Sequence, residues 1–240
     1  MRIARALLLT LALAALFSCS TVTVTRPTIA HVHIGHTTAG WADTPDRAGL
    51  LTVAEREADI AVESARKAFQ AARNPVELKR HVGNVLHAMD PALESGGPGT
   101  GYGFIRALEG ATDHLRFAAD SADASKNLKD SILGLESAAS RIRQSAKVGV
   151  ALCDEIRRTS KPEDLLSLAD ELKNQFDTIA RETKAWRVQL QEVIARENPP
   201  FSRIERRYLF GLIRLPNGLW QWHPDVEKAS NQGQGSSGYK

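Results

Sequence analysis

The sequence predicts an all-α protein built as an antiparallel bundle of four to five helices, with an extended N-terminal arm and a small C-terminal lid. Between residues 51 and 198, apolar residues recur at helical spacings of three and four. The breaks between these periodic stretches are short or are marked by proline and glycine. Short connections between long helices favour antiparallel neighbours, and 240 residues suffice for one domain with a hydrophobic core.

The first two predicted helices have clear start signals. Thr52 and Glu55 form a capping box. Behind it, one face is apolar at Ala58, Ala61, Val62, Ala65, Phe69 and Ala72. Asn74 is a good N-cap, and Pro75 follows it in the first turn of a second helix at residues 75–89.

Three further helices follow a loop. Residues 92–103 hold five glycines and one proline, so a loop precedes a third helix at residues 104–119. The fourth helix carries a regular a/d stripe at Leu128, Ile132, Leu135, Ala139, Ile142, Ala146, Gly149, Cys153 and Ile156. Ser160 and Glu163 suggest a capping box for the fifth, whose stripe is Leu165, Leu168, Leu172, Phe176, Ile179, Thr183, Trp186, Leu190 and Val193.

The segments outside the bundle have a different composition. Residues 19–50 combine a short alternating stretch with glycines and prolines, which indicates an extended arm. Residues 199–230 are aromatic and aliphatic around a Pro-Asn-Gly turn, so a lid or short hairpin is expected there. Residues 231–240 are rich in Gly, Ser and Gln, and we expect them to be disordered.

The N-terminus has the features of an export signal. Arg2 and Arg5 precede an apolar run over residues 6–17, which is too short to span a bilayer comfortably. The run ends at Leu16-Phe17-Ser18-Cys19, which resembles the lipobox of bacterial lipoproteins. An ordinary signal peptide cut elsewhere, or an uncleaved anchor, is the alternative.

The lipobox resemblance implies a location. It implies removal of residues 1–18 and attachment of acyl chains such as palmitate to Cys19. Ser20 follows, without the aspartate that retains lipoproteins at the inner membrane. By this resemblance the protein belongs to the bacterial cell envelope, anchored in the outer membrane and facing the periplasm, with an envelope protein as a further candidate partner.

Composition excludes several functional classes. Loss of Arg2 and Arg5 with the signal lowers the formal charge from +3 to +1, and nothing predicts nucleic-acid binding. Cys153 is the remaining cysteine beside Cys19, and its place on the helical stripe predicts a buried, reduced thiol. There is no covalent-haem, nucleophile-elbow, phosphate-loop or His-Glu-x-x-His motif, so no catalytic residue is predicted.

The histidines are the candidate site. His31, His33 and His36 fall within six residues of the arm. In an extended chain His31 and His33 would point the same way, and Gly35 would allow His36 to turn toward them. Neutral imidazoles suit zinc, copper, nickel and iron.

Two more candidates lie on the second and third helices. If those helices are antiparallel neighbours, His81 and His114 differ in depth by about 6 Å, and His87 and His114 by about 15 Å. His81 and His114 are therefore the better pair, with His87 and Asp113 as possible members of an outer shell.

The leading hypothesis is an envelope lipoprotein that binds a transition metal through His31, His33, His36, His81 and His114, for metal handling or sensing. A b-type haem between His81 and His114 is a second version. The rival classes are a metal-free interaction module with structural histidines, and a hydrolase that would use Asp113 or Asp43 beside an open metal position. Metal affinity is expected to fall below about pH 6.5, the ordinary histidine pKa.

Overall fold

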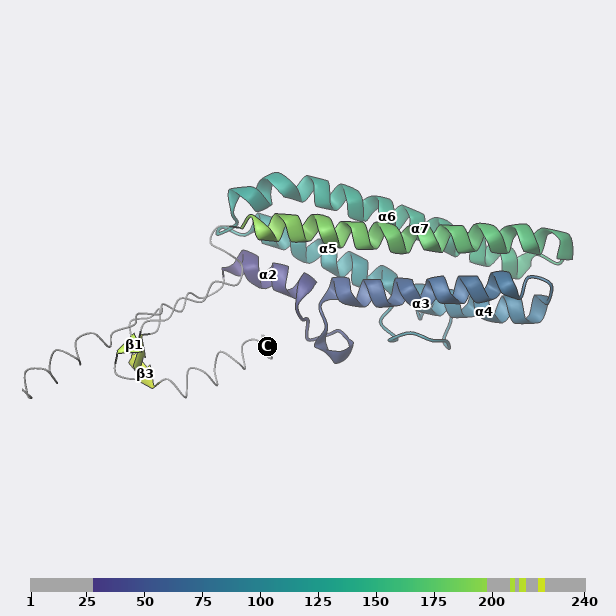
Figure 1. Ribbon diagram of the computed structural model, residues 1–240, viewed down its shortest axis with the longest axis horizontal. Coiled ribbons are helices and arrows are strands. Elements are labelled where there is room, and N and C mark those ends of the chain that lie inside the picture. The colour runs from purple at the N-terminus through teal and green to yellow at the C-terminus, as the bar shows by residue number, and fades with distance from the viewer. Residues whose placement is uncertain (1–27, 198–207, 210–211, 215–219, 223–240) are drawn as a thin grey trace, which may run out of the picture. The chain divides into compact units, whose positions relative to one another are not determined.

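The computed structural model describes residues 28–197, 208–209, 212–214 and 220–222. Within these residues the dominant elements are helices, which confirms the predicted all-α bundle (Figure 1). The helices are α2 (Ile29–Thr38), α3 (Leu50–Gln70), α4 (Pro75–Met89), α5 (Phe104–Asp120), α6 (Lys126–Arg158) and α7 (Pro162–Ala195), with a 3-10 turn η1 (Pro45–Arg47) between α2 and α3.

The bundle has four columns, two of which are interrupted by loops. Helices α6 and α7 run its full length, whereas α2 is followed by α3 and α4 by α5 (Figure 1). In each of these two loops, the first and last residues lie close together. A Cβ at Gly49 would lie 2.5 Å from the backbone of Thr38, and one at Gly103 would lie 2.8 Å from Pro91. Each second helix therefore begins where its predecessor ends, and the chain passes up and down the bundle four times.

The predicted stripes on α6 and α7 form the core between them. Apart from the half-buried Ile132 and Leu168, every residue of both stripes is buried. Gly149 permits a close approach, because a Cβ there would lie 2.8 Å from the ring of Phe176. The indole N–H of Trp186 donates to the carbonyl of Leu135 at 3.1 Å, so the largest buried side chain has its polar atom satisfied. Cys153 is a free, buried thiol, as predicted.

Two predicted helix starts are wrong. Helix α3 has Gly49 as its N-cap, while Thr52 and Glu55 both bind Arg187 of α7 instead, at 3.1 and 2.5 Å. Gly49 lies too close to the backbone of Thr38 to carry a side chain, which accounts for a glycine at this N-cap position. Helix α7 has Lys161 as its N-cap, with no side-chain capping bond. The start of α4 at Asn74 is confirmed, since its side chain accepts from Glu77 N–H.

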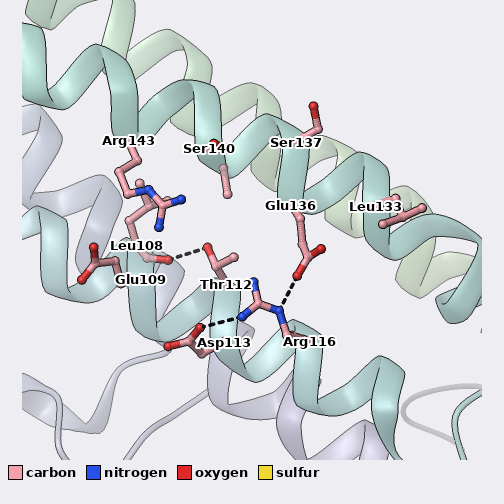
Figure 2. Close-up of a pocket in the computed structure, with 11 residues that line it drawn as sticks. Leu108, Glu109, Thr112, Asp113, Arg116, Leu133, Glu136, Ser137, Ser140 and Arg143 are labelled. Atoms are coloured by element: carbon pink, nitrogen blue, oxygen red, sulfur yellow. Dashed lines mark hydrogen bonds and ion pairs between the residues drawn. The ribbon is translucent and has the colours of Figure 1, made fainter.

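Helices α5 and α6 leave a shallow groove of about 490 Å³ on the surface between them (Figure 2). Arg116 bridges the two helices by donating to Glu136 at 2.6 Å. It also lies 3.6 Å from Asp113, more than half of whose side chain is exposed. The groove is therefore a polar helix–helix seam in which Arg116 pairs with both Glu136 and Asp113.

The segment predicted as an extended arm is helical over Ile29–Thr38, so that part of the prediction is wrong. Near the C-terminus, β1 (Tyr208–Leu209), β2 (Leu212–Arg214) and β3 (Trp220–Trp222) pair antiparallel in that order, with Leu212 opposite Trp222. Packing of this segment as a lid stays a prediction. The signal segment, Cys19 and the tail at 231–240 lie outside the described residues. The helices within the described part of the chain include none with the length and apolar character needed to span a bilayer.

Candidate metal centre

Helix α2 sets the geometry of the site. Its N-terminus is capped from two sides: Thr28 Oγ1 accepts from His31 N–H at 3.0 Å, and the Asp123 carboxylate accepts from Ile29 and Ala30 N–H. Its inner face is buried at Ala30, Ile34 and Thr37, three and four residues apart. The spacing of these buried residues is that of a helix, so the period of two assumed for His31 and His33 is wrong.

A helix pairs the histidines differently from a strand. Residues 31 and 33 are rotated by about 200°, whereas residues 33 and 36 are only about 60° apart. His33 and His36 consequently share the face of α2 that packs on α5, and His31 points elsewhere. This is the physical reason why His31 does not join His33 and His36.

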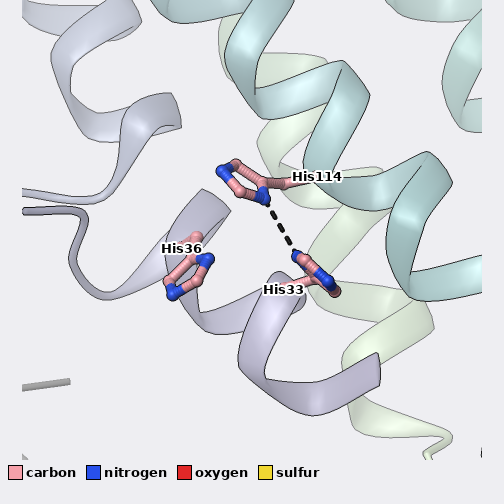
Figure 3. Close-up of side chains that lie close together, drawn as sticks. All are labelled: His33, His36 and His114. Atoms are coloured by element: carbon pink, nitrogen blue, oxygen red, sulfur yellow. Dashed lines mark hydrogen bonds between the residues drawn. The ribbon is translucent and has the colours of Figure 1, made fainter. Parts of the chain in front are cut away.

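Three imidazoles meet between α2 and α5. His33, His36 and His114 each offer a ring nitrogen, and these nitrogens lie within 4.8 Å of one another (Figure 3). His33 Nδ1 and His114 Nδ1 are 3.0 Å apart and share a hydrogen bond. Two nitrogens bound to one tetrahedral zinc ion would be about 3.3 Å apart, given Zn–N bonds of about 2.0–2.1 Å. The pair is thus spaced almost as metal ligands are, and a modest movement of His36 would complete the set.

His36 is the most unusual member of the cluster. Its side chain is 6% exposed, yet neither ring nitrogen has a hydrogen-bond partner within the described structure. An imidazole that is buried without a partner costs about 1–3 kcal/mol per unsatisfied group. A buried imidazole with two further imidazoles beside it could serve as a metal ligand.

Two aromatic side chains flank the cluster. The Trp41 ring lies 4.4 Å from the His36 ring and 4.7 Å from the His114 ring, centre to centre. Phe117 lies 5.6 Å from His33 and 6.0 Å from His114. Trp41 belongs to the loop inserted between α2 and α3, so this loop covers one side of the histidines.

The surroundings keep all three imidazoles neutral. Burial is the largest cause for each: it lowers the pKa of His36 to about 4, with the His114 and His33 rings adding to the effect. Burial also lowers the pKa of His114, helped by His33, and lowers that of His33, where Asp123 opposes it. Since the neutral form of imidazole is the one that binds metal, these lowered pKa values would favour metal binding at neutral pH.

His31 belongs to a different network. Its Nε2 lies 3.2 Å from Glu197 Oε2, and both side chains are buried. Glu197 Oε1 accepts from Ser125 Oγ at 2.8 Å and from Asn127 Nδ2 at 2.6 Å. This network joins the start of α2, the start of α6 and the residues after α7, which indicates a structural role for His31.

His81 and His87 also lie outside the cluster. Arg80 donates to His81 Nε2 at 3.1 Å on α4. His87 Nδ1–H donates to the carbonyl of Glu94 at 2.8 Å, in the loop that follows α4. Asp113, the other predicted outer-shell residue, lies beside Arg116 in the α5–α6 seam (Figure 2). Asp43 pairs with Arg106 at 2.5 Å.

The predicted pairing of His81 with His114 is wrong, because α4 and α5 are not antiparallel neighbours. They follow one another along the bundle and hardly contact each other (Figure 1). The loop between them contains Gly99, Gly101 and Gly103 at positive φ, and it returns the chain to its starting point instead of reversing it. A haem held between His81 and His114 therefore has no support in the structure.

Sequence reasoning missed Trp41 and Phe117 as neighbours of the site. For Phe117 a signal was present, since it lies three residues after His114 and such residues share a helical face. For Trp41 there was none, because its position depends on how the inserted loop folds back.

Searches of the chain against protein-family models, curated proteins and solved structures find no match.

Proposed function

We propose that the protein is a bacterial envelope lipoprotein whose helical bundle binds one transition-metal ion through His33, His36 and His114, for metal handling or sensing. The observation that carries the proposal is the convergence of three imidazoles, one of them buried with no partner for either ring nitrogen among the described residues. Zinc, copper, nickel and iron all accept such donors.

The donor set argues for metal binding over a purely structural cluster. Buried polar groups in folded proteins are almost always hydrogen-bonded, and each exception calls for an explanation such as a ligand or an ion. His36 is such an exception, whereas His31 and His87 have ordinary partners. A bound ion would give His36 a partner and replace the hydrogen bond between His33 and His114. All three ligands would be neutral imidazoles, so no charged side chain would have to change its protonation state.

The kind of function that fits the site depends on which other donor groups lie beside the imidazoles. Within the described residues, the group that could hold an ion contains no carboxylate or thiolate. Asp113 and Asp43 are engaged by arginines, so neither is placed as a general base. Storage, transfer or sensing of an ion is therefore a better fit than hydrolysis.

The direct test is metal titration of the full chain, purified in a nonionic detergent and stripped with a chelator. Isothermal titration with zinc should give one ion per chain. His33→Ala, His36→Ala and His114→Ala should each weaken binding by at least about 100-fold, since even outer-shell changes cost about 10–100-fold. His81→Ala and His87→Ala are matched controls on α4 and should bind as wild type.

A folded protein without affinity for zinc, copper, nickel or iron at neutral pH would reject the metal proposal. The bundle would then be better explained as a module that docks an envelope partner. Equal losses from His36→Ala and His81→Ala would also count against the site, because they would indicate a general effect on folding.

The envelope location has its own test. Cys19→Ser should block processing of the export signal and change how the protein partitions between membrane and soluble fractions. A normally processed, membrane-bound protein in that variant would reject the lipoprotein part of the proposal and leave the metal part standing.

A further inference from the structure

The cluster supplies three donors, one fewer than most zinc sites use. Structural zinc sites are closed by four protein ligands, whereas catalytic and exchange sites keep a position for an outside ligand. No further histidine, cysteine, aspartate or glutamate joins the group within the part of the chain that the structure describes. An ion bound by His33, His36 and His114 would therefore lack a fourth ligand from the bundle.

Several contacts that need no ion hold α2 in the bundle. Ala30 and Ile34 are buried in the bundle, and Asp123 caps the helix. Thr37 Oγ1 lies 3.2 Å from the carbonyl of Ala111, beside the cluster, and ties α2 to α5. These apolar, capping and hydrogen-bonded contacts hold α2 in the bundle without an ion, unlike a small domain whose folding requires its zinc.

The sides of the cluster differ in exposure. His36 is buried, and the Trp41 ring covers it together with His114. His33 is only partly buried, and its neighbour Phe117 is 51% exposed. The side of the cluster nearest solvent is therefore the one formed by His33 and Phe117. Figure 3 shows the rings of His33 and His114 facing each other.

Building on the proposed function, we propose that the three imidazoles hold the ion with one exchangeable coordination position, open on the His33–Phe117 side. This position takes a water molecule or a small monodentate anion, and in the cell it is where a donor side chain of a partner would take or deliver the ion. Exchange at this position is a simple ligand substitution: the incoming donor binds as water leaves, with no change in oxidation state.

Cobalt(II) is the probe, because it replaces zinc and its visible spectrum reports coordination number. The full chain in nonionic detergent is stripped, loaded with one equivalent of cobalt, and titrated with sodium azide. An intense visible band of four-coordinate cobalt is expected, and azide should shift the band in a saturable way with one anion bound per ion.

Two results would overturn the inference, and they are distinguishable. Cobalt that binds with a four-coordinate spectrum insensitive to azide would show that the chain itself closes the site, and the metal proposal would survive. A chain that binds neither cobalt nor zinc would reject both the site and the open position.

The direction of the opening has a matched pair of variants. Phe117→Ala should speed removal of cobalt by a chelator severalfold, because the side chain stands at the exposed edge of the cluster. Val188→Ala removes a similarly exposed apolar side chain from α7, with 54% against 51% exposed, and should leave the rate unchanged. Equal rates in both variants would contradict the proposed direction.

Discussion

Replacing His36 by phenylalanine should stabilise the metal-free protein while abolishing metal binding. The imidazole is 6% exposed, and neither of its nitrogens has a partner among the described residues. Removing an unsatisfied buried polar group relieves about 1–3 kcal/mol. A phenyl ring is close to the imidazole in shape and keeps the contact with Trp41, whose ring centre is 4.4 Å away. The variant separates the binding role of His36 from any role in packing.

The effect is large enough to measure by urea unfolding followed by circular dichroism. With a slope of about 2 kcal/mol per molar urea, a gain of about 2 kcal/mol raises the midpoint by about 1 M. The measurement uses the stripped full chain with a chelator present. Added zinc should raise the midpoint of the wild type through mass action and leave that of the variant unchanged.

His87→Phe is the control with the opposite expected sign. Its Nδ1–H donates to the Glu94 carbonyl at 2.8 Å, so the substitution should cost about 0.5–1.5 kcal/mol. His36→Leu guards against a phenylalanine that is simply too large. Suppose that both His36 variants unfolded at a lower urea concentration than the wild type and still bound zinc. His36 would then be a hydrogen-bonded core residue and not a metal ligand, and the prediction would be refuted.

Three further predictions concern pH, the buried thiol and a close contact. Because burial lowers the pKa of all three imidazoles, that of His36 to about 4, zinc affinity should persist below pH 6.5. The metal-free protein should lose about 3 kcal/mol between pH 6.5 and 4, since the unfolded chain takes up a proton that folded His36 does not, and His36→Phe should remove that loss from the pH dependence of unfolding. Burial raises the pKa of Cys153, so it should resist thiol reagents in the native protein, and Cys153→Ala should cost about 1 kcal/mol in unfolding experiments; rapid labelling would contradict the burial. Gly149→Ala should cost about 1–3 kcal/mol against the Phe176 ring, whereas Gly134→Ala on the same helix, where a Cβ would meet the Gln189 side chain at an ordinary 3.5 Å, should be neutral or stabilising; equal thermal shifts would argue against the contact.

The helices could be predicted because their signals are local. The Asn74 cap and the stripes of α6 and α7 depend on residues close in sequence, and they are confirmed apart from the half-buried Ile132 and Leu168. The starts of α3 and α7 could not be predicted in the same way. Thr52 and Glu55 have the spacing of a capping box, but Arg187 binds both of them from another helix. A tertiary ion pair overrides the local preference there.

The candidate site was predicted in part, for reasons of periodicity and topology. His33, His36 and His114 were in the predicted set and do converge. His31 was included because a period of two was assumed for a segment that is helical, and His81 because a long loop was taken to reverse the chain. The same residues analysed with a period of 3.6 would have placed His33 with His36 and separated His31 from both.

X-ray absorption at the zinc edge of the loaded full chain tests the central claim most directly. The account predicts a first shell of three imidazole nitrogens and one further light atom at about 2.0–2.1 Å, with imidazole outer-shell scattering. In His36→Ala the imidazole count should fall and the bound zinc should be lost or become weakly held. A first shell made of oxygens, or an unchanged three-imidazole spectrum in His36→Ala, would contradict the assignment of His33, His36 and His114 as the metal ligands.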